Sequence, residues 1–364
     1  MRKTQVALAA LALMASSAAL AAEVSISGVI DVGVASTSKN GGVGGVFLEN
    51  GAYNDHSAIE LNIGEDLGSG LKAYASLGMG FNPNGQSDNP GVGRGLSTAN
   101  DSISIHNNSL FNRQAFVGVS GEFGSIQLGR QLSPFVLSNV LMQNYIGMFG
   151  VGRMVLAGAG GTAGAFFVDN SVSYKTPAIA GFTLTAFATT PNGTRGNAFI
   201  DGADTDRYTA YHVAGSVGGA NLTAAYHKQN SGWSGWNAGG TMALMDGLTA
   251  SLGYVNTESA AGLKVGSWNV GAAYALTGAT TITAQHAFND DNGGNQKLSN
   301  IMLANALSKR TTVYGGYGWA DGNIGATIGT FGGTVSSSTS AAGTSIPASG
   351  KTNSAFVVGV SHAF

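Results

Sequence analysis

The 364-residue sequence has no cysteine, only 6 prolines, and charged side chains at only 10% of its positions. An ordinary soluble domain carries about 25% charged residues. The absence of cysteine excludes a disulfide-stabilised scaffold. Beyond the first two dozen residues, no apolar run approaches the roughly 20 residues that a membrane-spanning helix needs. The sequence therefore fits neither an ordinary soluble domain nor a helical membrane protein.

Glycine and large apolar side chains are abundant instead. The chain has 57 Gly, 16 Phe, 11 Tyr and 4 Trp, and 43% of its residues are hydrophobic. So many large apolar residues argue against a disordered chain. A slightly apolar, glycine-rich and proline-poor sequence without long apolar runs is typical of a transmembrane β-barrel, in which apolar and polar side chains alternate along each strand.

The N-terminus has the features of an export signal. A basic start, an apolar stretch and an A-x-A site at residues 19–21 follow one another. They predict a signal peptide over residues 1–21, cleaved near Ala21 or Ala22, and a single domain over residues 22–364. Acidic residues outnumber basic ones in the remaining chain, which offers no basic footprint for nucleic acid.

Alternation of side chains predicts the strands. Over residues 23–34 the even positions are mostly apolar and the odd positions mostly polar, as in a strand with one apolar face. The same period recurs over residues 59–63, 71–81, 222–226, 248–254, 268–274, 313–319 and 356–360. We predict an all-β fold, a transmembrane antiparallel β-barrel of about 16 strands, an even number as bacterial barrels require.

Short and long connections alternate along the chain, as expected for periplasmic turns and external loops. Aromatic residues close several strands that run toward long loops, and they indicate an interfacial girdle: Phe81, Tyr226, Tyr254, Phe288 and Trp319. The alternative is a soluble β-sandwich with these aromatics in its core. Sandwich strands are shorter and their connections lack this alternation, so we favour the barrel.

Two long tracts lack regular alternation. Residues 320–350 are rich in Ser and Gly and predict an external loop. Residues 132–168 are apolar, and residues 135–142 within them favour a short helix. Because an apolar loop of this length should not face water, we expect it to fold inward.

Two motifs carry a family resemblance. Residues 112–131 read NRQAFVGVSGEFGSIQLGRQ, and residues 170–182 read NSVSYKTPAIAGF. Together they resemble the general trimeric porins of Gram-negative bacteria, especially the β-proteobacterial branch. The resemblance extends from Glu23 to Phe364 and implies a 16-stranded homotrimer whose third loop, here about residues 132–168, narrows a water-filled channel. It implies passive diffusion of ions and small hydrophilic solutes across the outer membrane.

The resemblance also implies a charged constriction. Arg130 matches the family's Gly-Arg position there, and Asp169 lies near the start of a later strand. No Asp or Glu occurs from Phe123 through Val168, so the acidic half of the usual filter is missing. Arg153 is the only charged side chain inside the presumed third loop, and it is either a constriction cation or a tether to the wall.

The parity of other charged residues, that is, whether they fall on the apolar or the polar face of a strand, predicts where they lie. Glu60 and Lys72 lie on the polar parity of adjacent strands, which predicts that they line the lumen, where they can form a cross-strand pair. Arg113 shares the parity of Ala115, which favours a mouth or girdle position over the lumen. Arg130 has an alternative place at the outer rim, in contact with lipopolysaccharide or solvent.

The partners follow from the same resemblance. Besides two further copies of the chain, they are outer-membrane lipid, lipopolysaccharide and the outer-membrane insertion machinery. The chain ends in alternating apolar residues and the aromatic Phe364, the pattern that this machinery recognises. We therefore predict that Phe364 is an assembly signal.

Two other functions compete with a diffusion channel: an outer-membrane barrel enzyme, and a structural or adhesive barrel with a plugged lumen. The six His show no metal-binding spacing and no G-x-S-x-G elbow occurs, so we predict no catalytic residues, metal or cofactor. About 16 strands favour an aqueous lumen. With two arginines and no carboxylate between residues 123 and 168, we expect a weak preference for anions.

Overall fold

The structure is a computed structural model, and it describes residues 23–37, 46–54, 56–81, 83, 110–147, 167–190, 207–290, 297–321 and 353–364. The predicted signal peptide, Arg153 and the Ser-rich tract at 322–352 lie outside these residues. The strands are β1 (Glu23–Thr37), β2 (Val46–Asn50), β3 (Ser57–Gly68), β4 (Leu71–Phe81), β5 (Ala115–Gly121), β6 (Gly124–Leu132), β7 (Phe167–Lys175), β8 (Phe182–Thr189), β9 (Tyr208–Val217), β10 (Ala220–Gln229), β11 (Ser234–Met245), β12 (Leu248–Glu258), β13 (Lys264–Ala275), β14 (Thr280–Asp290), β15 (Lys297–Ala306), β16 (Thr311–Asp321) and β17 (Asn353–Ala363).

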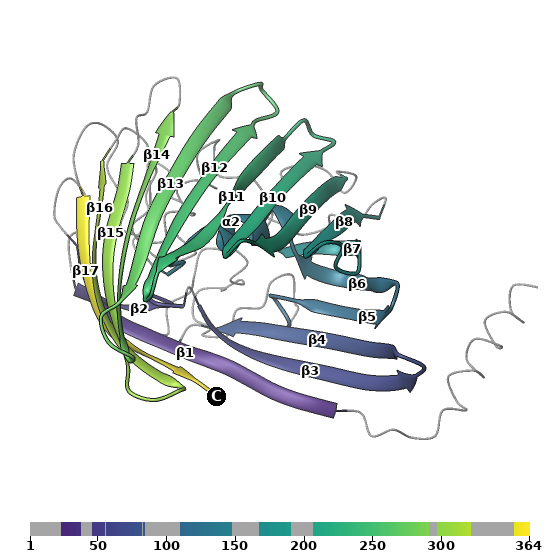
Figure 1. The fold of residues 1–364 in the computed structure, drawn as a ribbon, viewed down its shortest axis with the longest axis horizontal. Coiled ribbons are helices and arrows are strands. Elements are labelled where there is room, and N and C mark those ends of the chain that lie inside the picture. The colour runs from purple at the N-terminus through teal and green to yellow at the C-terminus, as the bar shows by residue number, and fades with distance from the viewer. Residues whose placement is uncertain are drawn as a thin grey trace, which may run out of the picture.

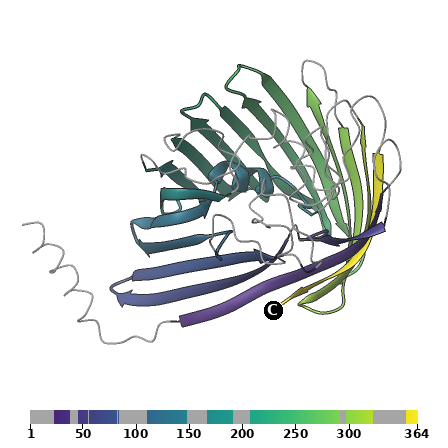
Figure 2. The ribbon, with the colours of Figure 1, turned by 180° about the vertical axis from the view of Figure 1, so that it is seen from behind.

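These strands form one antiparallel sheet that closes on itself. From β3 to β17 each strand pairs with the next in sequence, β1 pairs with both β2 and β3, and β1 also pairs with β17, from Val29 opposite Ala363 to Thr37 opposite Ala355. Figures 1 and 2 show the sheet curving around a central space, with the one described helix, α2 (Pro134–Leu141), inside the curve. The predicted antiparallel barrel is confirmed.

Two of the seventeen strands share one position in the wall. β3 pairs with β1 over residues 23–29, and β2 pairs with β1 over residues 32–36, so β2 and β3 lie end to end along the same edge. The described residues between them, 51–54 and 56, lie outside the sheet. The wall therefore has sixteen strand positions, which agrees with the predicted strand number.

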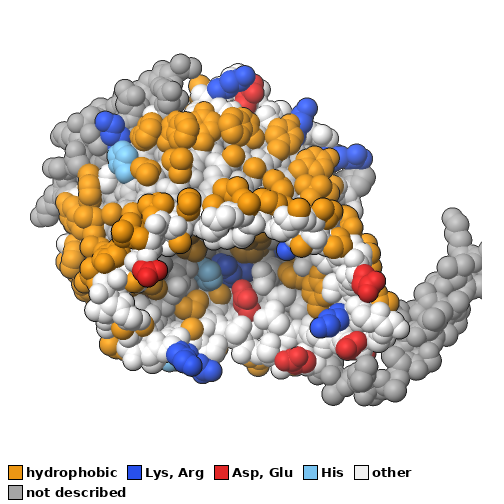
Figure 3. Space-filling model, in the orientation of Figure 1, with side chains coloured by type: hydrophobic (Ala, Val, Ile, Leu, Met, Phe, Trp, Pro, Cys, Tyr) orange, Lys and Arg blue, Asp and Glu red, His pale blue; other side chains and the backbone are white. Residues whose placement is uncertain are grey.

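Side chains alternate between a polar inner face and an apolar outer face. In β13, Trp268 and Val270 are exposed, whereas Ser267 and Asn269, which alternate with them, are each 1% exposed. Figure 3 shows hydrophobic side chains in a broad band over the outer surface of β9 to β14, and a hollow below it that contains charged side chains and a histidine. An apolar exterior around a polar interior is the pattern of a barrel that spans a membrane.

The two ends of the barrel differ in their connections. One end has short turns, such as the β3–β4 turn, where Gly68, Ser69 and Gly70 all have positive φ (81°, 52° and 78°). Two glycines suit this turn because a residue without Cβ adopts positive φ at little cost. The other end carries the long tracts that join β4 to β5 and β6 to β7. The predicted asymmetry between turns and loops is confirmed.

The C-terminal residue completes the seam between the first and last strands. The Phe364 N–H donates to the Gly28 carbonyl (3.0 Å), and the Gly28 N–H donates to the Phe364 carbonyl (3.1 Å). A Cβ at position 28 would lie 2.5 Å from Cζ of Phe364, so the ring packs in the space that Gly28 leaves. Phe364 is thus part of barrel closure, and its role as an assembly signal stays a prediction.

In the described part of the chain, no helix has the length and apolar character needed to cross a membrane.

Candidate functional site

An inward segment, residues 133–147, begins at the end of β6 and runs along the inside of the sheet. Ser133 precedes α2, and Pro134 occupies the first helical turn, where its missing N–H costs no hydrogen bond. The Ser133 hydroxyl lies 2.6 Å from the hydroxyl of Tyr208 on β9. The predicted inward fold and the short helix near residues 135–142 are confirmed, since the helix spans Pro134–Leu141.

Polar side chains of the wall hold α2 against β9, β10 and β11. The Thr223 hydroxyl donates to the Ser138 hydroxyl (2.8 Å) and also lies 2.9 Å from Nε2 of His212. The Asn237 amide donates to the Phe135 carbonyl (3.0 Å). These groups are buried, so each bond also removes the cost of an unpaired polar atom.

Apolar contacts complete the docking of the inward segment. The Phe135 ring lies 4.3 Å from the His227 ring, measured between centroids. Met142 packs over two glycines of β11 and β12: a Cβ on Gly253 would lie 2.3 Å from Met142 Sδ, and one on Gly239 would lie 2.9 Å from it. The glycines therefore leave the space that Met142 fills.

The far end of the segment reaches the turn between β2 and β3. The Tyr145 hydroxyl donates to the Ala52 carbonyl, and the Tyr145 ring centroid lies 6.4 Å from that of Tyr53. The segment thus crosses the interior from β6 to the wall near β1. The described part of the predicted third loop therefore lies inside the barrel, and its role as a constriction stays a prediction.

A buried carboxylate fixes that turn. Asp31 on β1 is fully buried, and its Oδ2 accepts hydrogen bonds from the backbone N–H groups of Tyr53 (2.8 Å) and Asn54 (2.5 Å). Its Oδ1 accepts from the hydroxyl of Tyr314 on β16 (2.7 Å). Asp31 therefore ties Tyr53 and Asn54 to the wall, and Tyr145 of the inward segment contacts Ala52 and Tyr53 of the same turn.

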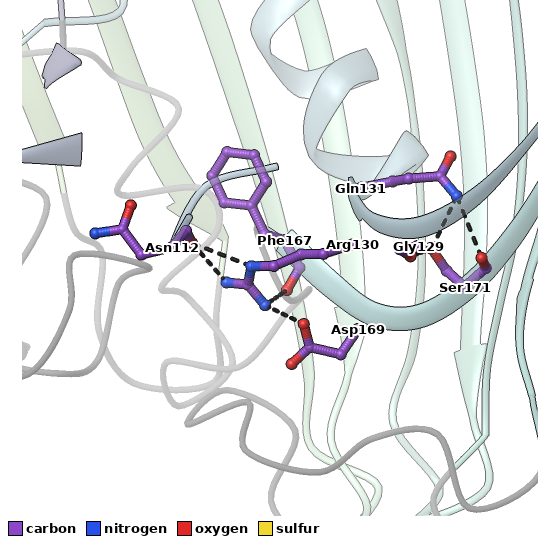
Figure 4. Close-up of polar contacts among 7 residues, drawn as sticks. All are labelled: Asn112, Gly129, Arg130, Gln131, Phe167, Asp169 and Ser171. Carbon is purple, nitrogen blue, oxygen red and sulfur yellow. Dashed lines mark hydrogen bonds and ion pairs between the residues drawn. The ribbon is translucent and has the colours of Figure 1, made fainter. Parts of the chain in front are cut away.

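Arg130 occupies the loop end of β6. Its Nε and Nη2 donate to the Asn112 carbonyl (3.0 and 2.9 Å), and Nη1 donates to Asp169 Oδ1 (2.6 Å) and the Phe167 carbonyl (3.4 Å). Figure 4 shows the guanidinium between Asn112 on one side and Asp169 on the other. Arg130 is 9% exposed, so the alternative position in solvent or lipid at the outer rim is wrong.

A β-bulge gives Arg130 this position. The pairing of β6 with β7 shifts between Gly129 and Gln131. Gly129 has φ +132°, and a Cβ there would lie 2.3 Å from the Ala115 carbonyl oxygen, so only glycine fits. In the Gly-Arg pair of the sequence, the backbone conformation of the bulge therefore requires glycine at position 129. The same conformation orients the Arg130 side chain.

Arg113 lies on the lumen side of the wall. Its side chain covers Gly78 and Gly80 of β4: a Cβ at these positions would lie 3.3 Å from Arg113 carbon atoms. These glycines share the inward parity of Ser76, whose hydroxyl donates to Asn62. The predicted outward orientation, in a girdle, is therefore wrong, because β5 begins only at Ala115 and Arg113 precedes the regular alternation.

Arg113, Arg130, Phe167 and Asp169 form one group, here called the arginine cluster. The guanidinium carbons of Arg113 and Arg130 lie 5.1 and 5.6 Å from the centroid of the Phe167 ring. Asp169, one residue beyond the acid-free stretch of the sequence, supplies a carboxylate to the cluster. Two cations therefore share one aromatic ring, and Arg130 is paired with the Asp169 carboxylate.

Glu60 and Lys72 do not form the predicted cross-strand pair. Glu60 pairs with Ser27 and Gly78, so it lies inward on the strand next to the glycine that Arg113 covers. Lys72 is exposed beside the β3–β4 turn and pairs with Asp66. The predicted pair is wrong because the β3–β4 turn sets a register in which Glu60 lies opposite Gly78, six positions along β4 from Lys72. Lys72 lies at the turn end, away from the arginine cluster.

The sequence alone does not predict the contacts of Asn112, Phe167 and Asp31. The Asn112 amide accepts from the Gly80 N–H (2.8 Å) and donates to the Gly80 carbonyl (3.1 Å), which extends the β4–β5 pairing by one step. Two glycines at alternate positions, 78 and 80, were an available signal that a neighbouring side chain covers that face. Within the described ranges, no three His, Cys, Asp or Glu residues are grouped to hold a metal ion.

Comparison with known proteins agrees with this geometry. A family model described as Gram-negative porin matches residues 7–325. The outer membrane porin protein 32 of Delftia acidovorans is 28% identical over 347 residues, covering 90% of this chain and 92% of the relative. An outer membrane porin protein of Bordetella pertussis is 26% identical over 381 residues, covering 86% and 93%.

Solved structures share the fold. The structure titled anion-selective porin from Comamonas acidovorans has a TM-score of 0.70 at 21% identity, covering 94% of this chain and all of that one. The trimer form of OmpT from Vibrio cholerae has a TM-score of 0.64 at 15% identity, with the same coverage.

Proposed function

This chain belongs to the Gram-negative porin family and is an outer-membrane porin, and we propose that its channel passes small neutral solutes and ions with a weak preference for anions. The observation that carries the proposal is the arginine cluster, in which the side chains of Arg113 and Arg130 lie over the same Phe167 ring on the inner side of the wall. Fixed cations in a narrow pore raise the local concentration of anions.

The preference is weak because the charges are partly compensated. Arg130 is paired with Asp169 at 2.6 Å, and Glu60 lies on the inner face one strand from the glycine that Arg113 covers. Water in the lumen screens these charges over about 8–10 Å. The Comamonas relative, whose title describes an anion-selective porin, supports the sign of the preference.

The wall behind the inward segment is uncharged, which suits neutral solutes. The inward side chains with less than 5% exposure on β11 to β15 are amides, hydroxyls and apolar groups, and they include Asn237, Ser251, Asn269, Gln285, Asn300, Val255, Ala287, Leu298 and Met302. These side chains carry no charge, so this part of the wall imposes no charge barrier on a neutral solute.

A planar bilayer recording in a salt gradient tests the proposal. We expect a reversal potential of the sign for anion preference, and Arg113→Gln should lower the anion-to-cation permeability ratio by about twofold. Lys309→Gln, in the exposed β15–β16 turn, removes the same charge away from the cluster and is the control. An unchanged ratio for Arg113→Gln contradicts the proposal, and zero conductance of the parent protein supports a plugged, structural barrel.

We also propose a homotrimer that assembles through β1, β3 and β4. Val24, Ile26 and Leu71 on these strands are 58%, 66% and 38% exposed on the outer face, and contact with a second copy would bury them. The Vibrio structure described as a trimer form supports this assembly. A monomer mass in mild detergent, together with a monomeric band in unheated electrophoresis, would contradict it.

The remaining outer surface is proposed to contact lipid and lipopolysaccharide. Assembly is proposed to use Phe364 as a signal to the insertion machinery. The relatives are channels rather than enzymes, and we propose no catalytic residue.

A further inference from the structure

The charged side chains of the inner wall gather on one arc of the barrel. Among the described residues, no Lys, Arg, Asp or Glu lies on the inward side of any strand from β8 to β17. α2 packs against β9, β10 and β11 of this uncharged arc. Inward charges lie on β1 to β7, as at Asp31, Glu60 and Arg130, and Figure 3 shows charged side chains inside the hollow. A solute in the lumen therefore meets the fixed charges of the described strands on one side only.

Two glycines of β4, here called the glycine patch, lie between a carboxylate and a guanidinium on this arc. Gly78 lies opposite Glu60 of β3 in register, and its carbonyl accepts a hydrogen bond from the Arg113 N–H (3.1 Å). The Arg113 side chain runs along the patch, because a Cβ on Gly78 would lie 3.3 Å from Arg113 Cβ and one on Gly80 would lie 3.3 Å from Arg113 Cδ. Glu60 and Arg113 therefore flank the same strand from opposite sides.

The two opposite charges do not pair with each other. Within the described ranges, the Glu60 carboxylate has no hydrogen bond or ion pair. The Arg113 guanidinium carbon lies 5.1 Å from the centroid of the Phe167 ring, which holds the guanidinium toward β7 and away from β3. Glu60 and Arg113 are both partly exposed. A negative and a positive group thus face the same glycine patch with a space between them.

An uncharged row of side chains separates this pair of charges from the turn end. The Gln114 amide donates to the Ser76 hydroxyl (2.8 Å), which donates to the Asn62 amide oxygen (2.8 Å). Farther along β3 and β4, the next inward charges are Asp66 and Lys72 beside the turn. The carboxylate and the guanidinium at the glycine patch are therefore a local pair of opposite charges on these strands.

We propose that Glu60 and Arg113 form a two-point site for zwitterionic amino acids in the lumen. The guanidinium fork of Arg113 suits the carboxylate of the solute, and the Glu60 carboxylate accepts hydrogen bonds from its ammonium group. The patch, which lacks Cβ atoms, gives the solute room between them. A simple anion or cation gains one attraction and meets one repulsion here, whereas a zwitterion gains both attractions. This inference rests on the proposed channel function and names a class of solute that the channel favours.

Swelling of liposomes that contain the purified protein tests the site. Alanine and lactamide are isomers of the same size, and only alanine is zwitterionic. After subtraction of the rates in protein-free liposomes, we expect alanine to enter about threefold faster than lactamide. Glu60→Gln and Arg113→Gln should each make the two rates equal, whereas Arg113→Lys, which keeps the charge, should retain most of the difference.

The matched controls are Asp66→Asn and Lys72→Gln, which remove one anion and one cation from β3 and β4 beside the turn. Both should keep the advantage of alanine. Equal rates of alanine and lactamide in the parent protein overturn the site. Loss of the advantage in Arg113→Gln but not in Glu60→Gln overturns the two-point site, because the solute carboxylate alone is then recognised. Loss of the advantage in the controls shows a general charge effect and also overturns it.

Ion selectivity separates this inference from the proposed anion preference. Arg113→Gln should lower the anion-to-cation permeability ratio and Glu60→Gln should raise it, although both variants lose the advantage of alanine. An advantage of alanine that rises in one variant and falls in the other follows net charge and overturns the site. If Arg113→Gln loses the advantage of alanine without a change in ion selectivity, the site stands and the proposed anion preference fails. The heat-modifiable band in electrophoresis verifies that each variant is folded before its rates are compared.

Discussion

The guanidinium of Arg130 and the carboxylate of Asp169 meet at 2.6 Å, although 39 residues separate them in the sequence. Both side chains are largely buried, at 10% and 22% exposure. Arg130 also binds the Asn112 carbonyl, so one cation links the starts of β5 and β7. The ion pair therefore links the two strands, and its carboxylate compensates the charge of Arg130 beside Arg113.

Asp169→Asn should increase the preference for anions. The amide keeps a hydrogen-bond acceptor near Arg130 but removes the charge that compensates it, and we expect the anion-to-cation permeability ratio to rise by about twofold. Bilayer reversal potentials measure this change. Asp66→Asn, in the exposed end of β3 beside the turn, is the control. A fall in the ratio for Asp169→Asn would show that Asp169 does not act on permeant ions through Arg130.

Gly253→Ala should weaken the docking of the inward segment. The new Cβ would lie 2.3 Å from Met142 Sδ, so the Met142 side chain must move, at a cost of about 1–3 kcal/mol typical of overpacking. We expect a lower temperature of thermal unfolding and noisier single-channel current. Gly64→Ala, where nothing lies within 4 Å of the new Cβ, should change neither. Equal behaviour of the two variants would mean that Met142 does not need this space.

His227 and His212 should respond in opposite ways to replacement by Phe. His227 is fully buried between Phe135 and Tyr208, and neither ring nitrogen has a hydrogen-bond partner among the described residues. An unpaired buried polar group costs about 1–3 kcal/mol, so His227→Phe should keep or raise stability. His212→Phe removes the bond to Thr223, which in turn binds α2 through Ser138, and should lower stability. Thermal unfolding measures both, and a greater loss for His227→Phe than for His212→Phe would contradict this account.

The strands were predictable because their information is local. A period of two and a change of connection length are visible in any short window, as in β13, where Trp268 and Val270 alternate with Ser267 and Asn269. The inward segment was predictable for a similar reason, since an apolar tract such as 132–168 cannot lie in water. Its helix was correctly placed within a residue at each end.

The arginine cluster was predictable only in part because it depends on register and on irregular backbone. Parity assigned Arg113 to the outer face, but the chain enters β5 two residues later. Parity also allowed Glu60 to face Lys72, whereas the β3–β4 turn pairs Lys72 with Asp66. A one-residue change in register reverses the face of every side chain, so single-sequence reasoning cannot fix such pairs.

Phe364→Ala should reduce the amount of assembled barrel, and deletion of Phe364 should reduce it further. The substitution removes the ring that fills the space over Gly28, while the deletion also removes both backbone hydrogen bonds between the last residue and β1. If the aromatic ring acts mainly as a signal for insertion, the two variants should lose similar amounts of assembled barrel in cells. They should nevertheless refold to different extents from urea into detergent. The heat-modifiable band in electrophoresis measures assembly in both settings.

Gly28→Ala separates the two roles of that ring. Its Cβ would lie 2.5 Å from Cζ of Phe364 and 2.6 Å from the Ala58 carbonyl oxygen, so it disturbs closure of the barrel while leaving the C-terminal sequence intact. We expect poor refolding in detergent for Gly28→Ala, because the β1–β17 seam is strained. Normal assembly of Phe364→Ala and of the deletion in cells at ordinary expression would contradict a signalling role. Normal refolding of Gly28→Ala would contradict the structural one, because the ring could then leave its place against β1 without loss of stability.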